Sequence, residues 1–146
     1  MAILLSDSKY KYDVAFAFLE KDEPLANHIN DLIKDKISTF LYSKKSEDSL
    51  NTKPEKTFID VFERQSRFIV ILFSSKWGTT PWTAIEEKAI RNRALEVGFD
   101  FLLCIPLDNP PETPRYLPQN RIWSGLSKLG VKGAAIAIEE LVLSLG

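Results

Sequence analysis

Four short apolar runs set the strongest limit on how this chain can fold. They are VAFAFL (14–19), ISTFLY (37–42), FIVILF (68–73) and FLLCIPL (101–107). None of them alternates cleanly between apolar and polar residues, which is typical of strands that are covered on both faces of a parallel sheet. The pattern therefore predicts a sheet that lies inside the protein.

The segments between these runs have the spacing of helices. Apolar residues recur at helical intervals in 24–37, 57–65 and 131–145. A further helix is expected from Pro81 to Gly98, with Thr80 as its N-cap and the glycine as its C-terminal stop. Because strands and helices alternate, we predict a doubly wound, flavodoxin-like α/β domain, a parallel sheet of about five strands with helices on both faces.

The composition agrees with a single domain over residues 1–146. The chain is 45% hydrophobic and 27% charged, and its net charge of −1 lacks the basic surplus that nucleic-acid binding needs. One cysteine, Cys104, excludes an internal disulfide framework, and one histidine, His28, excludes a multi-histidine metal site. We find no signal-peptide pattern and no apolar run of about 20 residues. The expectation is a cytoplasmic protein without bound metal, membrane contact or nucleic-acid partner.

The helix expected from Pro81 aims a carboxylate into its own apolar stripe. At about 100° per residue, one face carries Trp82, Ile85, Ala89, Ile90, Ala94 and Val97. Glu86 lies in the middle of this face, one turn after the tryptophan and on the same side. Glu87 points about 100° away, toward the polar side, and is the weaker candidate for a functional role.

Structural roles can also explain Glu86 and Trp82. Thr83 and Glu86 fit a capping box, in which the glutamate only accepts from a main-chain donor. Alternatively, Glu86 pairs with a cation such as Arg93. Trp82 can equally be a packing residue at the start of a helix.

The expected fold directs attention to one edge of the sheet. Open parallel sheets bind ligands beyond the carboxyl ends of their strands, where segments 18–23, 43–56 and 74–82 should meet. The phosphate-binding G-x-x-x-x-G-K-[ST] and the dinucleotide-binding G-x-G-x-x-G patterns are both missing from the sequence. Ser74 and Ser75 stand where a phospho-accepting receiver domain needs an aspartate.

Five stretches, in this order, carry a resemblance to a known family. They are YDVAFAFLEKDE (12–23), SRFIVILFSSKW (66–77), WTAIEEKAI (82–90), FLLCIPLDN (101–109) and RYLPQNRIW (115–123). The chain resembles a Toll/interleukin-1 receptor (TIR) domain of the bacterial type over about residues 10–145. The stretches are similar to the opening strand, the third strand with its serine-rich exit, the catalytic helix, the fourth strand and the approach to the fifth.

The resemblance implies an enzyme that hydrolyses the nicotinamide–ribose bond of NAD and yields nicotinamide with linear or cyclic ADP-ribose. The family's catalytic glutamate corresponds to Glu86, and the aromatic residue four positions earlier corresponds to Trp82. The polar turn Phe18-Leu19-Glu20 would line the nucleotide cleft. NAD is the substrate, so no cofactor is implied. A carboxylate against the ribose can stabilise the oxocarbenium-like charge that forms when the pyridinium leaves.

The resemblance also implies partners. TIR domains associate with one another, and the 43–56 loop often completes a neighbour's active site. Here this loop lacks the Arg-Asp-x-x-Pro-Gly box of animal receptor adaptors. The expected setting is bacterial antiphage immunity or cell-death signalling, with a fused or partner sensor domain. The alternative is a non-catalytic TIR module that acts as a signalling adaptor through protein–protein contacts.

Overall fold

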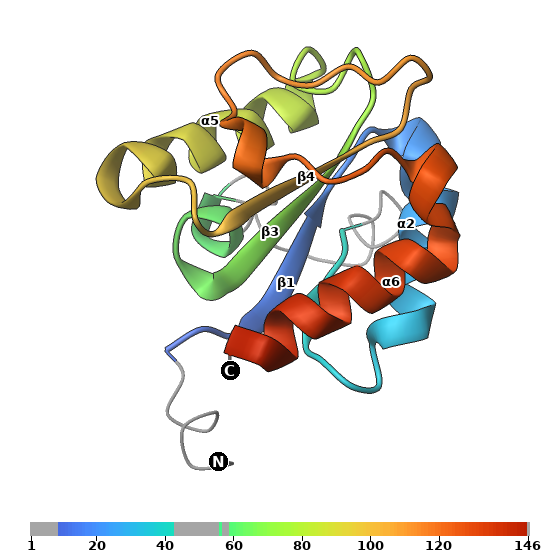
Figure 1. Ribbon diagram of the computed structural model, residues 1–146. Coiled ribbons are helices and arrows are strands. Elements are labelled where there is room, and N and C mark those ends of the chain that lie inside the picture. Colours follow the sequence, from blue (N-terminus) through green and yellow to red (C-terminus); the bar gives the residue numbers. More distant parts are fainter. Residues whose placement is uncertain (1–8, 43–55, 57–58, 146) are drawn as a thin grey trace.

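A parallel sheet forms the centre of the structure, a computed structural model that describes residues 9–42, 56 and 59–145 (Figure 1). Its strands are β1 (Tyr12–Ala17), β2 (Thr39–Phe40), β3 (Ser66–Phe73) and β4 (Leu102–Pro106). Their order across the sheet is β2-β1-β3-β4, and every neighbouring pair is parallel. This arrangement confirms the predicted doubly wound α/β class.

Helices cover both faces of the sheet, which explains why the apolar runs do not alternate. Helices α2 (Glu23–Ile33) and α6 (Leu126–Leu145) pack on one face, and α5 (Pro81–Val97) packs on the other with the short turn η2 (Val61–Gln65) (Figure 1). Along β1, Val14 and Phe16 belong to the α2–α6 core, whereas Ala15 and Ala17 belong to the α5 core. Successive side chains point to opposite faces, so both faces need apolar residues.

Several predicted boundaries differ from the structure. The second strand is limited to Thr39–Phe40, and α2 ends at Ile33 rather than at position 37. The chain turns there because the N–H groups of Lys36 and Ile37 both donate to the Ile33 carbonyl, at 2.9 and 3.1 Å. Helix α6 begins before position 131 but is interrupted at Gly130, whose φ of 68° is outside the helical range. The start of the helix predicted over 57–65 lies outside the described residues.

A fifth strand was expected, but four strands are present in the part of the chain that the structure describes. After β4 the segment 108–120 is rich in prolines, which cannot donate to a strand ladder. The edge of β4 is instead covered by residues 121–123. Trp123 N–H donates to the Cys104 carbonyl at 2.9 Å, and the Arg121 side chain donates to the carbonyls of Leu102 and Asp100, each at 2.8 Å. Cys104 and Ile122 thus form an isolated parallel bridge, and the guanidinium takes the place of strand N–H groups at Leu102 and Asp100.

We predict that Arg121→Ala lowers the free energy of unfolding by about 1–3 kcal/mol, because the main-chain carbonyl of Leu102 in β4 and that of Asp100 just before it lose a charged donor. Arg121→Lys keeps the charge but not the planar pair of donors, so it should recover only part of this loss. Urea unfolding of each variant measures the effect. Arg115→Ala, at an exposed arginine of the same connection, is the matched control. An Arg121→Ala variant as stable as this control would contradict the assigned role.

Candidate active site

A cleft of about 550 Å³ lies at the carboxyl ends of β1, β2 and β3. Its lining comes from the turn after β1, from Tyr42 after β2, from the turn after β3 and from the first turns of α5. The lining residues are Phe18, Leu19, Glu20, Lys21, Glu23, Tyr42, Lys76, Thr80, Pro81, Trp82, Thr83 and Glu86. The strand order reverses between β1 and β3, and this is the place where open α/β sheets bind ligands.

The structure brings all five residues singled out from the sequence to this cleft. Glu86 and Trp82 reach it from α5, and Phe18, Leu19 and Glu20 reach it from the turn after β1. Their catalytic and substrate-binding roles remain predictions. The 43–56 loop, which was expected to meet them, lies outside the described residues except for Lys56.

The N-terminus of α5 shows why Glu86 is not a capping residue. Thr80 is the N-cap and Pro81 the first helical residue, as predicted. Thr83 N–H donates to Thr80 Oγ1 at 3.2 Å, and Thr80 N–H donates back to Thr83 Oγ1 at 3.1 Å. The two threonines therefore form the capping box, and the proposed box of Thr83 and Glu86 is wrong.

Pairing of Glu86 with Arg93 is also wrong. The Arg93 guanidinium donates to the main-chain carbonyls of Phe62, Ser66 and Arg67, at 3.2, 2.7 and 3.3 Å. Arg93 therefore ties α5 to the start of β3. Further along the same helix, the prediction for Val97 fails as well: it is 64% exposed, because the last turn of α5 extends beyond the strands (Figure 1).

Glu86 is buried, with 5% of its surface exposed, and its hydrogen bonds come from neutral donors. The Trp77 indole Nε1–H donates to Glu86 Oε1 at 3.2 Å, and the Phe18 main chain supplies a second bond. Burial raises the pKa of the Glu86 carboxyl well above its usual range, and these two bonds lower it only in part. The cleft thus holds an acid whose proton is retained to a higher pH than that of an ordinary glutamate.

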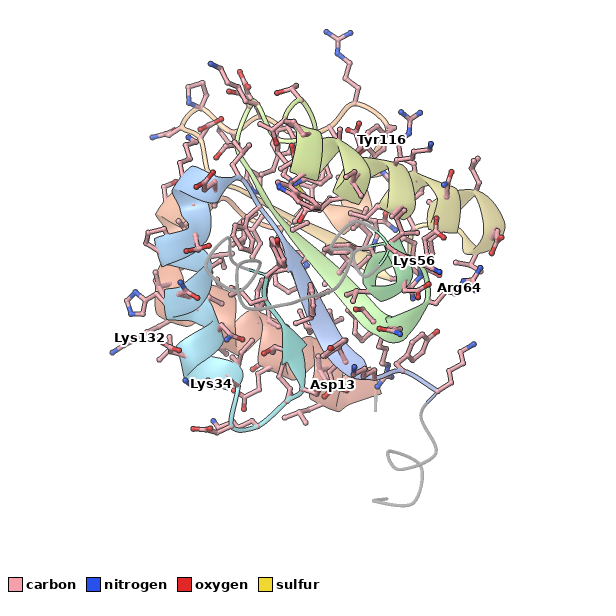
Figure 2. All side chains as sticks on the ribbon, turned by 180° about the vertical axis from the view of Figure 1, so that it is seen from behind. Asp13, Lys34, Lys56, Arg64, Tyr116 and Lys132 are labelled. Atoms are coloured by element: carbon pink, nitrogen blue, oxygen red, sulfur yellow. The ribbon has the colours of Figure 1, made fainter. Side chains whose placement is uncertain are left out.

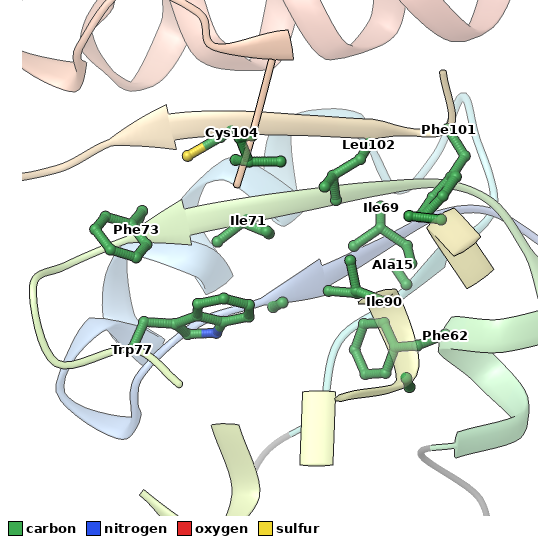
Figure 3. Close-up of a cluster of buried hydrophobic side chains, with 14 of the residues drawn as sticks. Ala15, Phe62, Ile69, Ile71, Phe73, Trp77, Ile90, Phe101, Leu102 and Cys104 are labelled. Atoms are coloured by element: carbon green, nitrogen blue, oxygen red, sulfur yellow. The ribbon is translucent and has the colours of Figure 1, made fainter. Parts of the chain in front are cut away.

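Trp77 is the site residue that sequence analysis missed. It follows β3 in the turn Ser74-Ser75-Lys76-Trp77 and is 3% exposed, within the core cluster between the sheet and α5 (Figure 3). Its ring packs against Phe73 with centroids 6.1 Å apart. Trp77 and Glu86 belong to different elements, so helical periodicity contains no signal that links them. The only sequence signal for Trp77 was its position at the end of the serine-rich turn after the third apolar run.

Aromatic rings form one wall of the cleft. Trp82 is half-buried, and its ring centroid lies 5.7 Å from that of Tyr42 at an interplanar angle of 44°. Trp82 therefore packs against the protein and also borders the cleft. Two exposed lysines, Lys21 and Lys76, contribute positive charge to the lining.

Side-chain hydrogen bonds join the turns at this edge. Ser74 Oγ donates to Asp22 Oδ2 at 2.8 Å and connects the turn after β3 with the turn after β1. Ser75 N–H donates to Asp108 Oδ2 at 2.9 Å and connects it with the loop after β4. These bonds fix the main chain immediately before Lys76 and Trp77.

Glu87 does not simply face solvent, as its helical phase suggested. Its Oε2 accepts a hydrogen bond from the Tyr116 hydroxyl at 3.1 Å, and Tyr116 lies against α5 (Figure 2). The Arg91 guanidinium lies 4.8 Å from the centre of the same ring. Burial, followed by the neighbouring Glu87 charge, raises the pKa of Tyr116. Glu87 therefore attaches the 108–118 connection to α5 and does not line the cleft.

Two other reactive side chains lie away from the cleft. Cys104 is buried in β4, and burial raises the pKa of its thiol to about 12, so it stays protonated and is a poor nucleophile. His28 is exposed on α2 and does not line the cleft.

Fold and site together define a doubly wound α/β domain with a ligand-sized cleft at the topological switch point. Neither a scan against protein-family models nor a search of curated proteins finds a match for the chain. Among the residues that the structure describes, no helix is both long enough and apolar enough to cross a bilayer.

We predict that Glu86→Gln becomes progressively more stable than the wild type as the pH rises. In the unfolded chain the carboxyl ionises near its usual pKa, but in the folded protein ionisation is delayed. Above the unfolded pKa the wild type therefore loses about 1.4 kcal/mol of stability per pH unit, until the folded pKa is reached. Glutamine can still accept from the Trp77 indole and does not titrate.

Urea unfolding at about pH 5 and about pH 8 tests this linkage. Glu96→Gln, on an exposed turn of the same helix, measures what the loss of one negative charge does by itself. A stability difference between Glu86→Gln and the wild type that is the same at both pH values would contradict the assigned burial of the carboxyl.

Proposed function

We propose that this chain is a TIR-type NAD⁺ glycohydrolase. The observation that carries the proposal is the buried Glu86 carboxyl, which lies in a cleft with one aromatic wall at the carboxyl edge of the sheet. An isolated buried carboxylate costs free energy, so its position in a ligand cleft favours a functional role. The order of sequence motifs supports the family assignment.

The reaction requires one carboxylate near the ribose. The bond between the nicotinamide nitrogen and the ribose C1′ breaks, and its electron pair leaves with nicotinamide, which becomes neutral. Water adds to the oxocarbenium-like carbon and loses a proton, so NAD⁺ and water give ADP-ribose, nicotinamide and H⁺. Ionised Glu86 would hold the ribose hydroxyls and stabilise the positive charge that develops on the sugar.

The raised pKa of Glu86 is compatible with this role. Its hydrogen-bond donors are neutral, so within the described residues no ion pair satisfies the carboxylate. The cationic pyridinium of NAD⁺ would supply the missing opposite charge and favour ionisation in the complex. The substrate thus stabilises the charge state that the reaction needs.

The remaining lining suits a dinucleotide. Trp82 and Tyr42 offer ring faces for a flat base, and Phe18 and Leu19 offer apolar surface. Lys21 and Lys76 can attract the pyrophosphate through the positive charge that they contribute to the lining. Glu20 would hydrogen-bond a ribose hydroxyl.

Assembly and biological setting are part of the proposal. We infer a cytoplasmic enzyme of bacterial antiphage or cell-death signalling that associates with its own copies, with the 43–56 loop at the contact. A neighbouring copy would then help to close the cleft. A fused or partner sensor domain would control this association.

We predict that Glu86→Gln lowers kcat/KM for NAD⁺ by about 10²–10³-fold or more, because a neutral amide cannot stabilise the developing charge. Chromatographic detection of released nicotinamide measures the loss. Glu87→Gln is the matched control, since Glu87 binds Tyr116 and does not line the cleft. If Glu86→Gln cleaves NAD⁺ at the wild-type rate, Glu86 is not the catalytic carboxylate and the proposed function fails.

We predict a graded series at Trp82, with Trp82→Ala less active than Trp82→Phe. Stacking on an aromatic ring contributes roughly 0.5–1.5 kcal/mol beyond area burial, which corresponds to a change of about 2- to 10-fold in kcat/KM. A phenyl ring should retain part of it. Steady-state kinetics at matched protein concentration provide the measurement, and equal activity of all three proteins would leave Trp82 with a packing role.

A further inference from the structure

A buried hydrogen bond joins Trp77, in the turn after β3, to Glu86 on helix α5. The indole Nε1–H of Trp77, in the turn after β3, donates to Oε1 of Glu86, on α5, at 3.2 Å. The tryptophan is 3% exposed and the glutamate 5% exposed. Glu86 lines the cleft and Trp77 does not, so the indole contacts the carboxyl from the protein side.

The indole is held in place independently of Glu86. Its ring packs in a T-shaped arrangement against Phe73, inside the core cluster that also contains Ile71 and Ile90 (Figure 3). Its main-chain N–H donates to the Ser74 carbonyl at 2.9 Å, and the Ser74 hydroxyl is bonded to Asp22. The donor therefore has a fixed position before any ligand binds.

We propose that Trp77 is the positioning residue of Glu86: its indole N–H fixes one carboxyl oxygen and stabilises the ionised form. The two oxygens of the carboxyl are then not equivalent, because Oε1 is occupied by the indole. A fixed orientation removes rotamer freedom that the glutamate would otherwise lose when the transition state forms. The catalytic part of this inference rests on the proposed function.

Other charged and titratable groups face the same cleft. The lining contains Glu20 and Lys21 from the turn after β1, Glu23 from the start of α2, Lys76 from the turn after β3 and Tyr42 from the segment after β2. The pKa of Glu86 is governed by burial, then by the Trp77 bond, then by the Phe18 main chain. Removal of the indole donor should therefore raise this pKa further.

The sharpest test replaces Trp77 with 3-benzothienylalanine, which has nearly the shape of tryptophan but carries sulfur where the indole has N–H. Trp77→Phe is the genetically simple variant. Phe73→Leu is the matched control, because it removes packing against the indole without removing the donor. NMR of the Glu86 side-chain carboxyl carbon, assigned by comparison with Glu86→Gln, follows ionisation against pH without any substrate.

We expect the benzothienyl variant to move the titration midpoint of Glu86 upward by about 1–2 pH units, the size expected for one hydrogen bond to a charged group. The acid limb of kcat/KM for NAD⁺ should move in the same direction. At a fixed pH below the midpoint, kcat/KM should fall about tenfold for each pH unit by which the midpoint rises. Phe73→Leu should lower stability and move the midpoint much less than the benzothienyl variant does, because the indole donor is retained.

The outcomes separate this inference from the proposed function. An unchanged midpoint in the benzothienyl variant overturns the role of Trp77, and so does an equal change in Phe73→Leu, since packing alone would then explain it. If the wild type cleaves no NAD⁺ but the midpoint moves as expected, the proposed function fails and the coupling of Trp77 to Glu86 stands. If Glu86→Gln is inactive and the midpoint does not move in the benzothienyl variant, the proposed function stands and the coupling of Trp77 to Glu86 fails.

Discussion

The Glu86 carboxyl is buried against the Trp77 indole and the Phe18 main chain, and the chemistry available to the cleft depends on this arrangement. Neither donor carries a charge, so the hydrogen bonds offset only part of the desolvation and the carboxyl keeps its proton to higher pH. Within the described residues no ion pair compensates the ionised form. The surrounding strands and turns hold the two donors and the carboxyl in this arrangement.

The sheet supplies the positions of the donors. Both of its faces are covered, by α2 and α6 on one side and by α5 and η2 on the other, so a ligand can approach the strands at their ends. Phe18 follows β1 and Trp77 follows β3, and these strands are neighbours at the switch point. The bonds of Ser74 to Asp22 and of Ser75 to Asp108 hold the turns together across this edge. A rigid edge allows a buried acid to keep a defined orientation.

Much of the fold could be predicted from local patterns because burial imposes them. Apolar runs without alternation indicated a sheet covered on both faces, and Thr80 with Pro81 gave the start of α5. The fifth strand could not be predicted correctly, since one isolated bridge of Ile122 to Cys104 and the side-chain donors of Arg121 cover the edge of β4, an arrangement that no strand pattern encodes. For the site, the helical phase of α5 correctly placed Glu86 and Trp82 on the side of the cleft. The turn after β1 was also correctly predicted to line it.

The sequence by itself determined the α/β class, the phase of α5 and the conflict of a carboxylate within an apolar stripe. These features depend on residue spacing within a single element, and spacing is explicit in a sequence. Only the tertiary structure decided what resolves the conflict. Thr83 caps the helix with Thr80, Arg93 binds main-chain carbonyls, and Trp77 donates to Glu86 across the cluster between sheet and helix. These partners come from different elements, and their contacts depend on how the strands are ordered and how α5 packs on them.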